Sequence, residues 1–134
     1  MPAQPTSIPA SPTTLEQQIL ELINQRRTAA GLQTVTIDGA LSTAARNHST
    51  YMASSRVGCT HIGQNGSSPL DRAKSAGYNG QVIGETVACG YTTALGAVDG
   101  WWSSPPHKAI LTSPNARQIG IGWAQNHQTA LMAR

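Results

Sequence analysis

The chain has 134 residues, a formal net charge of +3 at pH 7, and no Phe among its few aromatic residues. This length is sufficient for one domain with a core that needs neither metal nor disulfide support. The nine Lys and Arg residues are scattered, without a basic run interleaved with aromatic residues, which argues against nucleic-acid binding. No stretch is long and apolar enough to span a bilayer, so we expect a protein that is not transmembrane.

The first residues are rich in Pro, Ser, Ala and Thr, a composition that buries too little apolar surface to order a chain. We therefore expect a disordered N-terminal linker over residues 1–13 and one domain over residues 14–134. The linker has no charged segment followed by an apolar one, so it is not expected to be a signal peptide. The charged fraction of the chain is only 11%, which favours an exported protein.

Hydrophobic periodicity and capping residues predict the secondary structure in chain order. Helices are expected to begin at Thr13, Asp38, Ser68 and Thr92 or Thr93, and to end near Gly31, between Arg56 and Gly58, near Gly77 and at Ser104. Strands are expected around Val35 and Ile37, over residues 82–90, and as an antiparallel pair over residues 117–124 and 128–134. Trp101 and Trp102 are about 100° apart on their helix, so one of them is expected in the core and not both.

The apolar strand Val82–Gly90 carries one carboxylate, Glu85. An ionised Glu inside a domain is costly unless it is paired or hydrogen-bonded, so Glu85 needs a partner. The other five carboxylates are expected at the surface or at helix caps. Of the four histidines, His61 and His107 lie in segments that look like loops, and they are the candidate partners.

We expect His61, Glu85 and His107 to converge and to hold a divalent transition ion such as zinc. Two imidazoles and a carboxylate are suitable ligands, and they leave a position open for water. Their separations follow no local metal motif, so the fold must bring them together. His48 lies on the apolar face of the second helix, where we expect a packed histidine with one hydrogen bond.

The two cysteines, Cys59 and Cys89, flank these residues in sequence. If His61 and Glu85 meet, the cysteines come close too, which predicts a disulfide in an exported chain. Two free buried thiols are the rival interpretation. A metal site of the Cys-x-x-Cys type is excluded by the spacing.

Five segments occur in an order that resembles the bacterial members of the CAP superfamily, which includes cysteine-rich secretory proteins, antigen 5 and plant pathogenesis-related proteins of class 1. They read GLQTVTIDGALSTAARNHSTYMA, THIGQNGSSPLDRAKSAGY, VIGETVACGY, GWWSSPPHKAIL and QIGIGWA. The resemblance implies an α+β fold, an α-β-α sandwich with a small antiparallel sheet between helical layers. It also implies secretion, or export to the periplasm, and an open cleft to which His61, Glu85 and His107 contribute.

Three features depart from the family pattern. Thr86 replaces the usual Asn after the Glu, Pro106 and Lys108 replace the Gly and Arg around His107, and the final strand lacks the usual aromatic residues. The helix before His107 offers only hydroxyls where many relatives have a second acid, so a trio is expected in place of a tetrad.

The function favoured by the sequence is an extracellular binding module whose ligand is a lipid, a glycan, a peptide or a protein. No catalytic residue is assigned, because neither cysteine nor any serine lies in a nucleophile motif. A metal-assisted or acid–base hydrolase that uses the same three residues is the alternative. The third interpretation is a buried polar network that only shapes the fold.

Overall fold

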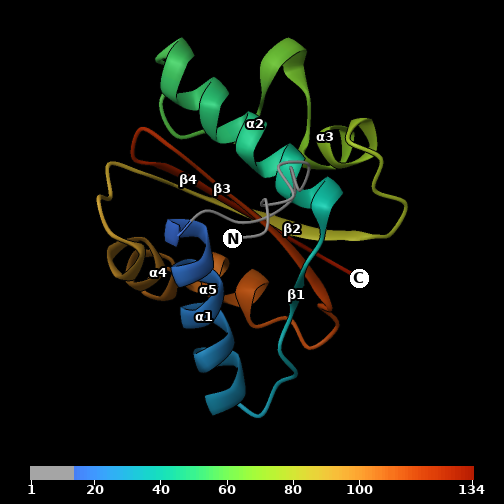
Figure 1. Ribbon diagram of the computed structural model, residues 1–134, viewed down its shortest axis with the longest axis vertical. Coiled ribbons are helices and arrows are strands. Elements are labelled where there is room, and N and C mark those ends of the chain that lie inside the picture. Colours follow the sequence, from blue (N-terminus) through green and yellow to red (C-terminus); the bar gives the residue numbers. More distant parts are fainter. Residues whose placement is uncertain (1–13) are drawn as a thin grey trace, which may run out of the picture.

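The computed structural model describes residues 14–134 (Figure 1). The expected linker and the capping residue Thr13 lie outside the described residues. The helices are α1 (Thr14–Ala29), α2 (Gly39–Ser55), α3 (Pro69–Ser75), α4 (Ala94–Trp102) and α5 (Pro105–Leu111), with a short 3-10 helix η1 (Gln64–Gly66). The strands are β1 (Thr36–Ile37), β2 (Val82–Cys89), β3 (Gln118–Ala124) and β4 (His127–Ala133). No helix in residues 14–134 is long and apolar enough to cross a membrane.

The helix starts follow from their capping residues. Asp38 accepts a hydrogen bond from the Leu41 amide and so begins α2. Ser68 and Asp71 form a reciprocal capping box at α3, with Pro69 in the first turn. Thr93 accepts from the Gly96 amide and begins α4. These three helix starts are as the sequence predicts.

The four strands form one sheet in the order β1-β3-β4-β2. β3 pairs antiparallel with β4, and β4 pairs antiparallel with β2. The short edge strand β1 runs parallel to β3, so the expectation of a purely antiparallel sheet is wrong at this edge. Several helices and the strand β2 separate β1 from β3 in sequence, which gives the chain room to enter both from the same end of the sheet.

Helices cover both faces of the sheet, which confirms the α-β-α sandwich (Figure 1). Alternate residues of β4 divide between two cores. Leu131 and Ala133 pack with α2 and α3, whereas Ala130 and Met132 pack with α1, α4 and the end of α5. Both cores are almost entirely aliphatic, as a chain without Phe requires.

The two adjacent tryptophans of α4 have different environments. Trp101 is 1% exposed, and its indole donates a hydrogen bond to the carbonyl of Val87 over 3.1 Å. Trp102 is only partly buried, and the guanidinium of Arg26 lies 5.2 Å from its ring centroid. The prediction that one of the pair is core is confirmed, and the core residue is Trp101.

Helix α2 lies unusually close to β3. A Cβ atom on Gly120 would overlap the backbone of Leu41 and Ser42, and a Cβ on Gly122 would overlap the backbone of Ala45 and Arg46. The two glycines therefore let the backbone of α2 contact the sheet directly. This contact sets the distance between the sheet and the side chains of α2.

Glu16 forms a buried ion pair that the sequence did not predict. Glu16 is 1% exposed and pairs with Arg46 of α2, with Nη2 of the arginine 2.7 Å from Oε1. Its position in the first turn of α1 is typical of a helix-capping carboxylate. The partner lies 30 residues away on another helix, so the local pattern does not reveal the ion pair.

Candidate functional site

Strand β2 brings Glu85 into the layer between the sheet and helices α2 and α3. Glu85 pairs in register with Leu131, which belongs to the α2 and α3 core. The next residue, Thr86, pairs with Ala130 and so faces the opposite layer. Within residues 14–134 the Thr86 hydroxyl is buried without a hydrogen-bond partner. Thr86 therefore does not take over hydrogen bonds of the Asn that it replaces.

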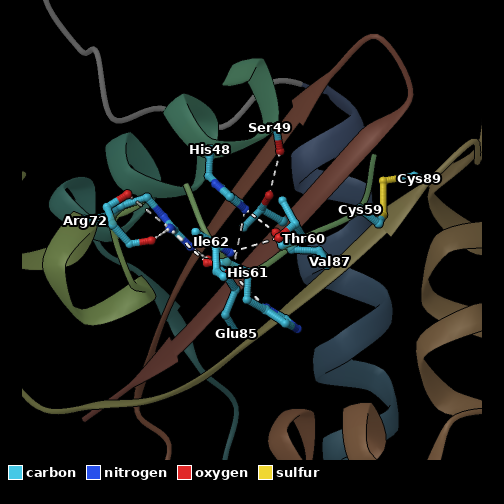
Figure 2. A network of polar contacts seen from close by, with 12 residues as sticks. His48, Ser49, Cys59, Thr60, His61, Ile62, Arg72, Glu85, Val87 and Cys89 are labelled. Atoms are coloured by element: carbon cyan, nitrogen blue, oxygen red, sulfur yellow. Dashed lines mark hydrogen bonds and ion pairs between the residues drawn. A yellow bond between two sulfur atoms is a disulfide. The ribbon is translucent and has the colours of Figure 1, made fainter. Parts of the chain in front are cut away.

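Three side chains surround the Glu85 carboxylate, which is 1% exposed (Figure 2). Nη2 of Arg72 lies 2.6 Å from Oε2, and Nδ1 of His61 lies 3.0 Å from Oε1. Nε2 of His48 lies 3.9 Å from the same Oε1 atom. The predicted pairing of Glu85 with His61 is confirmed. Arg72, which was not predicted, supplies the positive charge that a buried carboxylate needs.

The hydrogen bond to Glu85 sets the tautomer of His61. A carboxylate only accepts, so Nδ1 of His61 must carry the proton and donate it. In the neutral ring Nε2 then keeps its lone pair. The His61 side chain is 49% exposed, so this nitrogen belongs to the accessible part of the network. His61 can therefore act as a ligand or a base while Glu85 holds its orientation.

His48 forms the buried floor of the network. Its Nε2 lies 2.6 Å from the carbonyl oxygen of Thr60, so Nε2 carries the proton and donates. The pKa of His48 is lowered, mainly by burial, with the Arg72 and His61 charges adding to the effect. The Thr60 hydrogen bond and Glu85 act in the opposite direction. The prediction of a packed histidine with one hydrogen bond is confirmed, and its position beside Glu85 was not predicted.

A disulfide and an arginine hold the loop that carries His61. Cys59 and Cys89 are bridged, with their Cα atoms 5.8 Å apart, which confirms the predicted pair and ties the loop to the end of β2 (Figure 2). Nη1 of Arg72 donates to the carbonyl of Ser67 over 2.8 Å and to that of His61 over 3.1 Å. Arg72 thus fixes both the loop and the carboxylate that the loop faces.

Arg72 is the functional residue that sequence reasoning missed. Its position on the short helix α3 shows no pattern that separates it from the exposed Lys74. The one available signal was that a buried Glu85 needs a cation. The sequence gives no reason to prefer one of the nine Lys and Arg residues over the others.

His107 lies on helix α5 and not in a loop, contrary to expectation. Pro105 and Pro106 occupy the first turn, where a missing amide proton costs nothing, so the prolines begin this helix. The pKa of His107 is lowered by burial first and by the nearby His61 second. Its Nδ1 is buried without a partner in the described chain. The fold therefore brings His107 within electrostatic range of His61.

No three His, Cys, Asp or Glu side chains within residues 14–134 are grouped closely enough to hold a metal ion. Glu85 is already bound on both oxygens, by His61 and Arg72. A metal ion held by these residues would therefore depend on the two imidazoles, with Glu85 acting through His61.

A comparison against known families finds a match over most of the chain. The cysteine-rich secretory protein family, CAP, matches residues 20–131. The chain belongs to the CAP family. Among relatives, it is 33% identical over 121 residues to the uncharacterized protein YkwD of Bacillus subtilis, covering 90% of this chain and 47% of that protein. It is 30% identical over 117 residues to the uncharacterized membrane protein YlbC of the same species, covering 87% of this chain and 34% of YlbC.

The chain thus spans less than half the length of the curated relatives it matches. Among solved structures, an extracellular protein of Bacillus anthracis containing an SCP domain superposes with a TM-score of 0.87 at 23% identity, over all of this chain and 45% of the other. An outer surface protein of Borrelia burgdorferi superposes with a TM-score of 0.80 at 22% identity, over 92% and 96% of the two chains. At these identities the two structures show a common fold.

Proposed function

We propose that this CAP-family chain is a binding module that acts outside the cytoplasm and takes a divalent transition ion, such as zinc, between His61 and His107. Its ligand is an extracellular lipid, glycan, peptide or protein. The disulfide supports an oxidising compartment. Relatives described as extracellular and as an outer surface protein support the same location.

The observation that carries the proposal is the hydrogen bond from Nδ1 of His61 to Glu85. Histidines that bind metals commonly donate their second ring N–H to a carboxylate, which fixes the tautomer and raises the basicity of the ligating nitrogen. His61 has this arrangement and is half exposed. Glu85 is thus the supporting member of the trio, and Nε2 of His61 is the ligand.

His107 supplies the second imidazole. Its lowered pKa keeps the ring neutral at physiological pH, and a metal ligand must be neutral to bind. Two protein nitrogens are fewer than the three or four ligands of dedicated zinc sites. We therefore expect modest affinity, with water completing the coordination.

Melting curves at pH 7.5, with and without zinc, test the proposal. Zinc at about 100 times its dissociation constant adds roughly 2.7 kcal/mol of stability, which raises the melting temperature of a domain this size by several degrees. His61→Ala and His107→Ala should each lose most of this shift. His127→Ala is the control, because His127 lies on β4 and hydrogen-bonds the Gln125 carbonyl. Equal shifts in all four proteins, or none in any, would refute the metal site.

A hydrolase that uses His61 as a base is the second candidate. The Glu85–His61 hydrogen bond is the orienting contact that an imidazole base needs. Turnover of a screened ester or glycoside that is lost in His61→Gln, with the fold retained, would favour this function. If substrates, zinc and other ligands leave both proteins unaffected, the trio is a structural network.

A further inference from the structure

A cavity lies beside the network, between α2 and the segment from η1 to α3. Its volume is about 310 Å³, near the lower end of the range for small-molecule sites. Side chains of α2 form one wall, η1 forms the lip, and α3 forms the opposite wall. Glu85, His61 and His107 do not line it, so this cavity is separate from the candidate metal site.

The lining mixes polar side chains with apolar surface and carries no unpaired charge. Its principal polar groups come from Thr43, Asn47, Gln64, Asn65, Ser67 and Ser75. Amides and hydroxyls both donate and accept hydrogen bonds. The one charged lining side chain is Arg72, and its guanidinium is bound to Glu85 at 2.6 Å. The cavity therefore suits a neutral ligand with many hydroxyl or amide groups, and it lacks the free cation that an anion would require.

Tyr51 contributes an aromatic surface to the lining. The ring is partly buried and stacks on His48, with centroids 6.2 Å apart and an interplanar angle of 23°. The stacking holds the Tyr51 ring at the wall of the cavity. An aromatic face carries partial negative charge and attracts the weakly positive C–H groups of an apolar face. Sugars combine such a C–H face with a rim of hydroxyls.

We propose that this cavity binds a neutral carbohydrate of one or two sugar units, held by the amides of Asn47 and Asn65 and packed against Tyr51. Asn65, at the lip of the cavity, adopts a left-handed backbone conformation with φ of 59°. Residues other than glycine hold this conformation at an energetic cost, and such residues cluster at binding sites.

The cavity shares two residues with the network around Glu85. His48 and Arg72 line the cavity and also contact or approach Glu85. A sugar in the cavity would therefore contact His48 and Arg72, the two residues that lie between it and the Glu85 carboxylate. Its binding should be visible at His61 as well as at the cavity residues.

Titrations followed by amide NMR test the proposal, with N,N′-diacetylchitobiose and cellobiose as separate probes and inorganic phosphate as the anionic control. At least one disaccharide should give saturable shifts at Asn47, Tyr51 and Asn65, with smaller ones at His61, and phosphate should give none there. Asn47→Ala removes one amide from an exposed helix position and should weaken the affinity about five- to tenfold. Ser75→Trp fills the cavity and should abolish binding.

Thr50→Ala is the matched control, since Thr50 is an exposed residue of α2 outside the cavity, and this variant should bind like the wild type. The dispersed spectrum of each variant verifies its fold. Saturation by phosphate and by neither sugar would overturn the proposal. So would sugar affinities that are equal in wild type, Asn47→Ala and Ser75→Trp, or the absence of saturable shifts with both sugars.

Discussion

Arg72 and Glu85 form an ion pair between α3 and β2, with Nη2 2.6 Å from Oε2 and side-chain exposures of only 9% and 1%. Removing one partner of a buried pair leaves an uncompensated charge, which typically costs about 3–5 kcal/mol. We expect Arg72→Ala to lose stability in this range. Urea unfolding measures the loss, and Lys74→Ala, an exposed change on the same helix, should cost little.

A double-mutant cycle sharpens this prediction. Glu85→Gln removes the buried negative charge, so Arg72→Ala should cost less in the Glu85→Gln background than in the wild type. Additive losses would show that the two side chains are not energetically coupled, and they would contradict the pairing.

The Cys59–Cys89 disulfide closes a loop whose ends are 30 residues apart in sequence. In the chain-entropy model such a crosslink contributes roughly 3–4 kcal/mol. We expect the free energy of unfolding to fall by about this amount when a reductant is added to the wild type. The double variant Cys59→Ala/Cys89→Ala should start at the lower stability and show no response to the reductant. An unchanged wild type under complete reduction would contradict the prediction.

The two tryptophans should differ in their contribution to stability. Trp101→Ala creates a large cavity and leaves the Val87 carbonyl without its indole donor, which should cost about 3–5 kcal/mol. Trp102→Ala removes partly exposed surface and one contact with Arg26, for which about 1–2 kcal/mol is expected. Chemical denaturation of both variants checks the order, and equal losses would mean that α4 is rotated from the described position.

Stability should fall as the pH falls below about 6.5. The pKa of His48 and that of His107 are lowered in the fold, so the unfolded chain binds these protons first. Stability then rises with pH through this window, by at most about 1.4 kcal/mol per pH unit for each group. Near His48 the charged or titratable groups are Glu85, Arg72 and His61, and Tyr51 stacks on its ring.

Urea unfolding between pH 5 and pH 8 measures this slope. His48→Gln keeps a donor for the Thr60 carbonyl but does not titrate, so its slope should be smaller. His127→Gln should keep the slope of the wild type. Stability that increases as the pH falls would show that the buried ring is protonated in the fold.

Most helices and strands were predictable because their signals are local. Ser68, Asp38 and Thr93 cap the helices that they were expected to cap. Strand β1 is different, because its two residues carry no information about which strand they join or in which direction. The helix at His107 had a usable signal, since Ser104-Pro105 repeats the Ser68-Pro69 arrangement that begins α3.

The site was predictable only in part. Glu85 and His61 were paired from the cost of burying a carboxylate and from the family resemblance, and the structure joins them at 3.0 Å. Arg72 could not be chosen in the same way, because its role depends on how α3 lies against β2. The Glu16–Arg46 pair was hidden for the same reason, since each residue alone looks like an ordinary surface charge.

The contact of α2 with Gly120 and Gly122 determines which parts of this protein can be redesigned. Any side chain at either glycine would lift α2 and with it His48, Asn47 and Tyr51 together. A mutant library that aims at a new ligand should therefore leave β3 and the buried face of α2 unchanged. Diversity belongs at Gln64 and Ser75, two exposed residues that line the cavity and whose side chains take no part in the helix caps or the Glu85 network.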